Sequence, residues 1–95
     1  MKNYFVYIIE GERTSKKNKR KKILYTGFTD NPQKRLQEHR TKKKSNFMKI
    51  FQIIPKKIVY LEQVKGYMNA LIREKQIKKM PHNKKITLIK TYMGY

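Results

Sequence analysis

Short apolar runs separated by charged or turn-forming residues divide the chain into candidate strands and helices. The run "YFVYII" at residues 4–9 is rich in aromatic and β-branched residues, which predicts a strand buried on both faces. The runs "KILYTGF" at 22–28 and "KIVYLEQV" at 57–64 predict two further strands. The polar segment "GERTSKKNKRKK" at 11–22 is far longer than a two-residue hairpin turn, so it predicts a mobile basic loop inserted between two antiparallel strands.

The first helix signal lies just after the second predicted strand. Asn31 followed by Pro32 predicts a helix start, because asparagine caps free backbone N–H groups and proline has the φ angle of the first helical position. We expect this helix to run to about Lys43. Residues 45–54 predict a second short helix, although their apolar pattern also fits a strand, and Pro55 is expected to end this segment.

The clearest helix signal is "YMNALIREKQIKKM" at residues 67–80, which Gly66 precedes and Pro81 closes. Residues 82–95 predict one more short helix. With 95 residues the chain can bury one modest core, so we expect a single domain spanning 1–95. The predicted fold class is α/β in the mixed (α+β) sense, a small three-stranded antiparallel sheet flanked by helices.

The charge of the chain points to a polyanionic partner. Lysine and arginine number 25 against 6 acidic residues, and like charges at this density oppose the compact state. Nucleic acid is the leading partner, because neutralising phosphates with Lys and Arg supplies most non-specific affinity. An acidic membrane surface is the weaker interpretation, since it favours a basic amphipathic helix with exposed Trp, Phe or Leu, and the chain has no Trp.

Several protein classes are excluded at this point. No apolar stretch approaches the ~18 residues of a membrane span, and the N-terminal "MKNYFVYIIEGER" reaches charged residues too soon for a signal peptide. We therefore expect an intracellular protein, cytoplasmic or, in a eukaryotic host, nuclear. The absence of cysteine excludes disulfides, zinc fingers and cysteine nucleophiles, so any metal must be bound by oxygen or imidazole ligands. Nothing in the chain predicts an oligomeric state.

A group of polar residues is expected to converge near the second strand. Arg35 and His39 are four residues apart and share one helix face. Gly27 sits just before that helix, where a missing Cβ lets a ligand approach the backbone. Tyr25 lies two residues upstream of the glycine, and a roughly symmetric hairpin would bring Tyr7 of the first strand beside it.

Phosphate chemistry also needs charge neutralisation, and a carboxylate holding Mg²⁺ or Mn²⁺ is the natural solution without cysteine. Glu74 is the best candidate, because it falls between Leu71 and Ile77 in the apolar arc of its helix, a costly place for an unpartnered carboxylate. Glu38 is expected on a different helix face from Arg35. The remaining acids have plainer positions at a turn, at loop starts or at a strand end: Asp30, Glu10, Glu12 and Glu62.

Each of these residues has an ordinary alternative role. The two tyrosines could be packed strand aromatics, and the arginine and histidine could form a solvated basic face. Glu74 could make only surface ion pairs, and Gly27 could be only a turn glycine. The cluster "KKNKRKK" at 16–22 could contact phosphate or act as a nuclear address, but charge runs are usually just solvated.

Four separated motifs nevertheless resemble one family in order and spacing. They are "FVY" at 5–7, "YTG" at 25–27, "KRLQEH" at 34–39 and "ALIREKQIKK" at 70–79. Together they resemble the GIY-YIG nuclease family, particularly its small single-domain members. In that family a first tyrosine motif is followed by a second ending in glycine, then a helix with arginine, then a helix with glutamate.

The resemblance implies a metal-dependent endonuclease that hydrolyses DNA phosphodiester bonds. It implies that Glu74 holds one Mg²⁺ or Mn²⁺ at the scissile phosphate and that Arg35 stabilises the charge on its oxygens. Tyr25 or Tyr7 would activate the water, and His39 would share that work or bind the leaving phosphate. Nearby cations and the metal would favour the ionised form of the tyrosine base.

The expected substrate is double-stranded or branched DNA, with structure-specific cleavage in DNA repair or recombination as one role. A GIY-YIG-like domain that only grips DNA or RNA is the main alternative, and a small basic RNA-binding protein of the ribosomal kind is a third. No membrane partner is expected. The residues expected to contact nucleic acid are Gly27, Lys34, Lys16, Lys17, Lys19, Arg20, Lys21 and Lys22.

The chain also departs from the family pattern. Phe5 replaces the first glycine of the family, which mainly affects packing. Phe28 follows "YTG", where some excision-repair relatives carry a lysine, so any role of that lysine is missing or moved. The predicted basic loop is longer than the usual hairpin connection, and the zinc-binding domain of some structure-specific relatives is absent.

Overall fold

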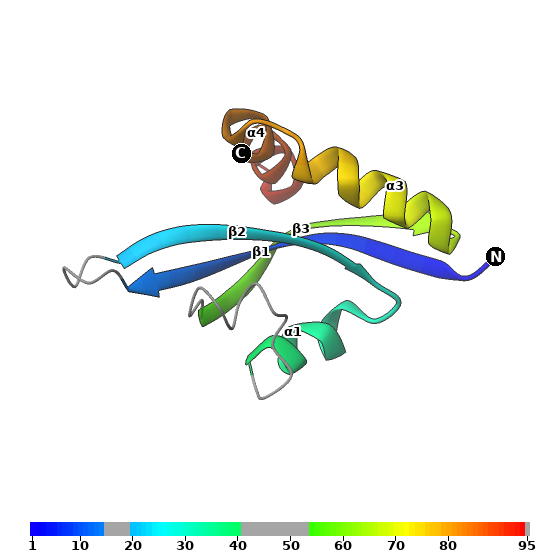
Figure 1. Ribbon diagram of the computed structural model, residues 1–95, viewed down its shortest axis with the longest axis horizontal. Coiled ribbons are helices and arrows are strands. Elements are labelled where there is room, and N and C mark those ends of the chain that lie inside the picture. Colours follow the sequence, from blue (N-terminus) through cyan, green and yellow to red (C-terminus); the bar gives the residue numbers. More distant parts are fainter. Residues whose placement is uncertain (15–19, 41–53, 95) are drawn as a thin grey trace.

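An antiparallel sheet of three strands forms the centre of the molecule (Figure 1). β1 (Asn3–Thr14) is the middle strand, flanked by β2 (Arg20–Thr29) and β3 (Ile54–Lys65). All three predicted strands are confirmed, and each is longer than its apolar run. The computed structural model describes residues 1–14, 20–40 and 54–94.

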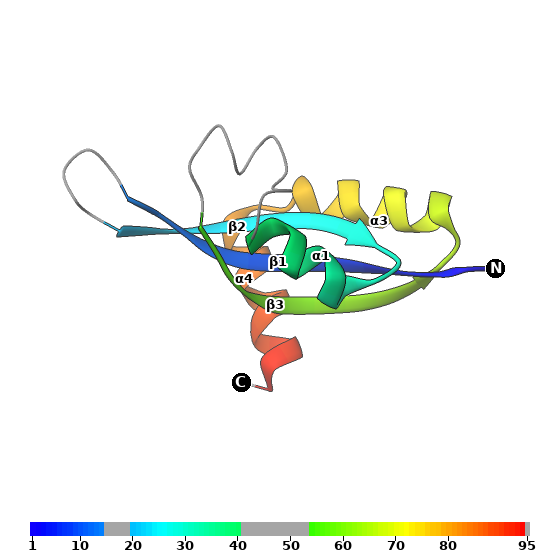
Figure 2. The same ribbon diagram turned by 90° about the horizontal axis from the view of Figure 1, so that it is seen from below.

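Helices cover both faces of this sheet, which confirms the predicted α+β class. α1 (Pro32–Arg40) packs on one face, while α3 (Tyr67–Lys78) and α4 (His82–Met93) pack on the other (Figure 1). Seen from the α1 side, α3 runs along the β2 edge of the sheet (Figure 2). Within the described residues, no helix is long and apolar enough to cross a membrane.

Side chains of β1 alternate between the two faces and divide the core in two. Val6 and Ile8 belong to the cluster that includes Ile77 of α3. Tyr7 and Ile9 belong to a second cluster on the other face, packed beneath α1. The prediction of a strand buried on both faces is confirmed, because β1 is central in the sheet and covered from both sides.

Local sequence signals fix the starts of two helices. The Asn31 side-chain oxygen accepts the N–H of Lys34 at 3.1 Å, which is the N-cap geometry that the sequence predicted. Gly66, between β3 and α3, has a φ of 90°, a left-handed conformation that a residue with a side chain adopts only with strain. The predicted ends at Gly66 and Pro81 are confirmed as the boundaries around α3.

The basic insertion predicted for 11–22 is wrong in extent, because most of it is paired strand. Glu12 faces Lys22 and Thr14 faces Arg20 in the β1–β2 ladder. Backbone hydrogen bonds hold such a ladder without apolar side chains, and cross-strand pairs of opposite charge support it. The Lys22 ammonium also lies 4.0 Å from the Glu10 carboxylate. The connection shrinks to residues 15–19, which lie outside the described part of the chain.

Three further expectations concern segment boundaries. Pro55 does not end a helix but lies inside β3, an edge strand where a missing N–H is tolerated, opposite an irregularity in the ladder. The helix end expected near Lys43 and most of the 45–54 segment lie outside the described residues. The last helix, α4, has 12 residues, the same length as α3, and is therefore not short.

Candidate active site

Tyr7 lies at the centre of the α1 face and is 2% exposed. Its ladder partner is Gly27. A Cβ at position 27 would meet the Tyr7 hydroxyl and come within 2.7 Å of the ring carbon that carries it. The sequence interpretation of Gly27 as a turn that opens the backbone to phosphate is therefore corrected. Gly27 lies inside β2, and the space beside it holds the ring of Tyr7.

Arg35 of α1 donates a side-chain hydrogen bond to the phenol oxygen of Tyr7. Its guanidinium Nη1 also donates to the Glu38 carboxylate at 3.3 Å. The expectation that Glu38 lies on a different helix face from Arg35 is wrong, because residues three apart are neighbours on a helix surface. The guanidinium is thus oriented from two directions, by the phenol of β1 and by the carboxylate of its own helix.

Burial raises the pKa of Tyr7 to about 12, although the hydrogen bond from Arg35 works in the opposite direction. Negative charge on Tyr25 and Glu74 raises the same pKa further. The phenol of Tyr7 therefore keeps its proton at neutral pH. These interactions couple the Tyr7 phenol electrostatically to the Arg35 guanidinium and to the Glu74 carboxylate.

Tyr25 lies on the same face of the sheet as Tyr7, as the hairpin argument predicted. Ile9 is its partner in the ladder, so the two tyrosines are diagonal neighbours rather than a direct pair. The Tyr25 ring packs against the cluster formed by Tyr7 and Ile9 but is only half-buried. Of the two phenols, Tyr25 is the one that a solvent molecule can reach.

Glu74 approaches this group from α3, which lies along the β2 edge. Its side chain is 12% exposed, and the Lys78 ammonium lies 2.9 Å from the carboxylate. A carboxylate in this apolar arc of the helix needs a partner, and Lys78, one helical turn away, provides it. Among the described residues no group of three or more His, Asp or Glu side chains could enclose a metal ion.

The other predicted site residues are more scattered. Lys34, Lys21 and Lys22 are exposed, the first on α1 and the other two on the far end of β2. His39 belongs to α1, but its side chain lies outside the described part of the structure, as does that of Arg20. Lys16, Lys17 and Lys19 lie outside the described residues altogether.

Sequence reasoning missed three residues next to this group. Lys78 could have been found from its i,i+4 spacing to Glu74, and Glu38 from its i,i+3 spacing to Arg35. Thr26 follows Tyr25 in β2 but is buried on the opposite face of the sheet, and it carries no sequence signal beyond its place in "YTG".

Comparisons with known proteins agree with this geometry. The family model described as the GIY-YIG catalytic domain matches residues 3–87 of the chain. A UPF0213 protein from Syntrophus aciditrophicus (strain SB) is 44% identical over 90 residues, which cover 94% of this chain and 91% of that relative. No solved structure is a significant match.

Proposed function

The chain belongs to the GIY-YIG catalytic domain family, whose domains are generally nucleases that act on DNA, and from this premise we propose a divalent-metal-dependent endonuclease that hydrolyses DNA phosphodiester bonds. One observation carries the proposal. A buried phenol on β1 is hydrogen-bonded to Arg35 of α1 and interacts electrostatically with Tyr25 of β2 and Glu74 of α3. Residues far apart in sequence thus interact with the Tyr7 hydroxyl. Packing of the core alone does not require this arrangement of polar groups.

The donor set fits a Mg²⁺ or Mn²⁺ ion held by one carboxylate. Mg²⁺ commonly keeps several waters and is bound through one or two carboxylates together with substrate phosphates, so it does not need an enclosed cage. Glu74 would hold the ion, which would take the place of the Lys78 ammonium at the carboxylate. When bound, the ion would supply Lewis-acid stabilisation of the phosphoryl oxygens.

The remaining roles follow from burial and charge. Arg35 is a permanent cation oriented by Tyr7 and Glu38, and it would stabilise charge that develops on the phosphoryl oxygens. Tyr25, half-buried, would accept the proton of the attacking water in its ionised, phenolate form, which nearby cations and the metal would favour. Tyr7 is poorly suited to that task, since its raised pKa favours the protonated phenol, and it would instead orient the guanidinium.

The proposed substrate is double-stranded or branched DNA. A formal charge of +19 gives strong attraction for phosphate, and exposed Lys21, Lys22 and Lys34 are suited to backbone contacts. With DNA as substrate, we expect the protein to work inside the cell. Stronger cleavage of branched than of linear DNA would support a role in repair or recombination.

The proposal is tested by incubating the protein with supercoiled plasmid and with branched DNA in Mg²⁺, Mn²⁺ or EDTA. We expect cleavage with either metal and none in EDTA. Arg35→Lys keeps the charge but loses the planar fork, so its single-turnover rate at saturating protein should fall by about 10²–10³-fold while affinity changes little. Arg13→Lys, on the far end of β1, is the matched control and should cleave like the wild type.

A domain that binds DNA without cutting it is the second candidate. The formal charge of +19 favours this alternative, because it attracts phosphate whether or not cleavage follows. Saturable, salt-dependent DNA binding with no metal-dependent cleavage of any substrate would establish the binding module and refute the nuclease.

A further inference from the structure

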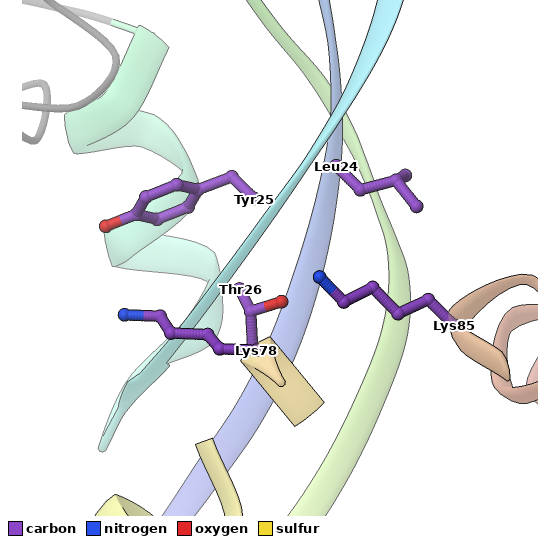
Figure 3. Close-up of a pocket in the computed structure, with 5 residues that line it drawn as sticks. All are labelled: Leu24, Tyr25, Thr26, Lys78 and Lys85. Carbon is purple, nitrogen blue, oxygen red and sulfur yellow. The ribbon is translucent and has the colours of Figure 1, made fainter. Parts of the chain in front are cut away.

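A pocket of about 380 Å³ lies at the edge strand β2, beside the candidate active site (Figure 3). We call it the β2 edge pocket and define it by its lining residues, Leu24, Tyr25, Thr26, Lys78 and Lys85. Lys78 comes from the last turn of α3, and Lys85 comes from the first turns of α4. The pocket thus lies between β2, α3 and α4. Of its lining residues, only Tyr25 and Lys78, the partner of Glu74, also belong to the candidate active site.

Thr26 contributes a polar atom that the protein leaves unpaired. The residue is 4% exposed, and its hydroxyl oxygen is buried without a hydrogen-bond partner in the described structure. Figure 3 shows this hydroxyl and the Lys85 amine directed toward one another from opposite sides of the pocket. A buried unpaired hydroxyl costs free energy, so its retention at the wall of a pocket points to a ligand that pairs with it.

The charge of the pocket defines the chemistry of that ligand. Two lysines line it, Lys78 and Lys85. Of these two, only Lys78 has a carboxylate partner among the described residues, and that partner is Glu74. Lys85 makes no ion pair with the described residues. An ammonium beside a hydroxyl donor is suited to a phosphate oxygen, which accepts from both.

The volume of the pocket and its apolar lining restrict the kind of ligand that fits. A volume of about 380 Å³ exceeds what a bare phosphate needs and lies at the lower end of the ~300–1,000 Å³ of small-molecule sites. Leu24 lies on the same side of β2 as the Thr26 hydroxyl and Lys85 and offers apolar surface next to the cationic end, whereas the Tyr25 ring points to the other side (Figure 3). We propose that the β2 edge pocket binds the phosphate of a single nucleotide unit, with the Thr26 hydroxyl and the Lys85 ammonium on the phosphate and with Leu24 against its sugar or base.

This binding needs no cleavage, so it stands or falls separately from the nuclease. The phosphate has two sources, a free mononucleotide or a nucleotide within a strand. The full-length chain is titrated in EDTA, at constant ionic strength, with thymidine monophosphate, with unphosphorylated thymidine and with an eight-residue oligothymidylate. We expect thymidine monophosphate to bind and to raise the melting temperature, and thymidine to do neither.

Matched lysine variants separate the pocket from the overall positive charge. Lys85→Met should lower the affinity for thymidine monophosphate by about 10-fold or more, because a charge-assisted hydrogen bond is lost. Lys84→Met removes the same charge from the exposed neighbouring position on α4, and its affinity should stay within about 2-fold of the wild type. Equal losses in the two variants would overturn the proposal.

Thr26→Val is expected to lower the affinity for the nucleotide without lowering the stability of the free protein. Valine has nearly the same shape, so removing the unpaired hydroxyl should leave the melting temperature of the free protein unchanged or higher. Affinity for thymidine monophosphate should nevertheless fall by about 2–10-fold. Undiminished affinity in Thr26→Val would exclude the hydroxyl as a ligand and overturn the proposal.

The oligonucleotide distinguishes the two sources. If Lys85→Met and Thr26→Val weaken oligothymidylate binding as they weaken the mononucleotide, a strand phosphate enters the pocket. If they weaken only the mononucleotide, the pocket binds free nucleotides. Both results support a nucleotide phosphate site, whereas failure of thymidine monophosphate to bind the wild type contradicts it.

Discussion

The two faces of the sheet use the same central strand for different purposes. On the α3/α4 face, Val6 and Ile8 of β1 join a cluster that includes Ala70 and Ile77, all fully buried and apolar. On the α1 face, Tyr7 is equally buried, but its hydroxyl is bound by Arg35. The α3/α4 face therefore holds the larger apolar cluster, with polar contacts among Tyr60, Glu62 and Arg73, whereas the α1 face buries a phenol that an arginine holds in place.

The faces are joined at the β2 edge. Glu74 belongs to α3, which packs on the apolar face, yet its charge acts on Tyr7 of the α1 face. The packing of α3, anchored by Ile77, thus fixes the position of a carboxylate that serves the opposite face. A small protein can in this way place an acid beside a buried phenol without burying both on the same side.

The largest expected effect tests the division of stability between the faces. Ile8→Ala should destabilise the protein by about 4 kcal/mol, near the upper part of the range for buried isoleucine, because its cluster is built mainly of apolar side chains and lies beneath two helices. Ile9→Ala, beneath α1, should cost only about 2 kcal/mol. Urea denaturation of both variants measures the difference, and equal costs would break the comparison.

The next effect concerns the buried phenol. The folded-state pKa of Tyr7 lies at about 12 against an ordinary 10.0, so folding favours the protonated form. That contribution is complete below pH 10 and is lost as pH rises toward 12. Relative to Tyr7→Phe, the wild type should lose about 2–3 kcal/mol of unfolding free energy over this window.

Urea denaturation at a series of pH values measures this difference, because the other titrating groups are common to both proteins. Tyr67→Phe is the matched control, since Tyr67 is 54% exposed and its substitution should leave the pH dependence unchanged. Parallel stability curves for the wild type and Tyr7→Phe would show that the Tyr7 hydroxyl is not desolvated by folding.

Gly27→Ala should destabilise the protein by about 1–3 kcal/mol, because the new methyl group meets the Tyr7 ring. The cost should largely disappear in a Tyr7→Leu background, where the ring is gone. A double-mutant cycle by chemical denaturation measures this coupling. An additive result would mean that Gly27 is required for a reason other than room for Tyr7.

The smallest effect concerns the end of the β1–β2 hairpin, which extends past both helical layers (Figure 1). Replacing Lys21 and Lys22 with serine should flatten the salt dependence of DNA binding by up to ~0.9 slope units per lost phosphate contact, with the saturated cleavage rate unchanged. Affinities measured across a salt series test this prediction. An unchanged slope would show that neither lysine contacts a phosphate of the DNA.

Local signals explain which parts of the fold could be predicted. The apolar runs of the three strands and the cap at Asn31 depend on neighbouring residues, and the structure confirms them. The extension of β1 and β2 through charged residues was missed, because backbone pairing leaves no apolar pattern. The order of the motifs predicts that Tyr7, Tyr25, Arg35 and Glu74 lie near one another, and all three of the other residues interact with Tyr7 in the structure. Their spacing alone does not say how they meet.

The missed details depend on register and on distant packing. The sequence indicates an opening for a ligand at Gly27, whereas the structure fills that space with Tyr7. The pairing of position 27 with Tyr7 is set by the whole hairpin and not by the neighbours of the glycine. Thr26 becomes buried only when the distant helix α3 packs against β2. No single stretch of sequence contains that information.

Cleavage and binding by Glu74→Gln test the central claim that a carboxylate from the apolar face serves the chemistry of the other face. With Mg²⁺, the single-turnover rate on saturating DNA should fall by about 10³-fold, since metal stabilisation is worth several kcal/mol. DNA affinity should stay equal or rise, because a negative charge is removed. Glu12→Gln, which makes the same change on the hairpin, should cleave like the wild type. Metal-dependent cleavage by Glu74→Gln at the wild-type rate would contradict the account.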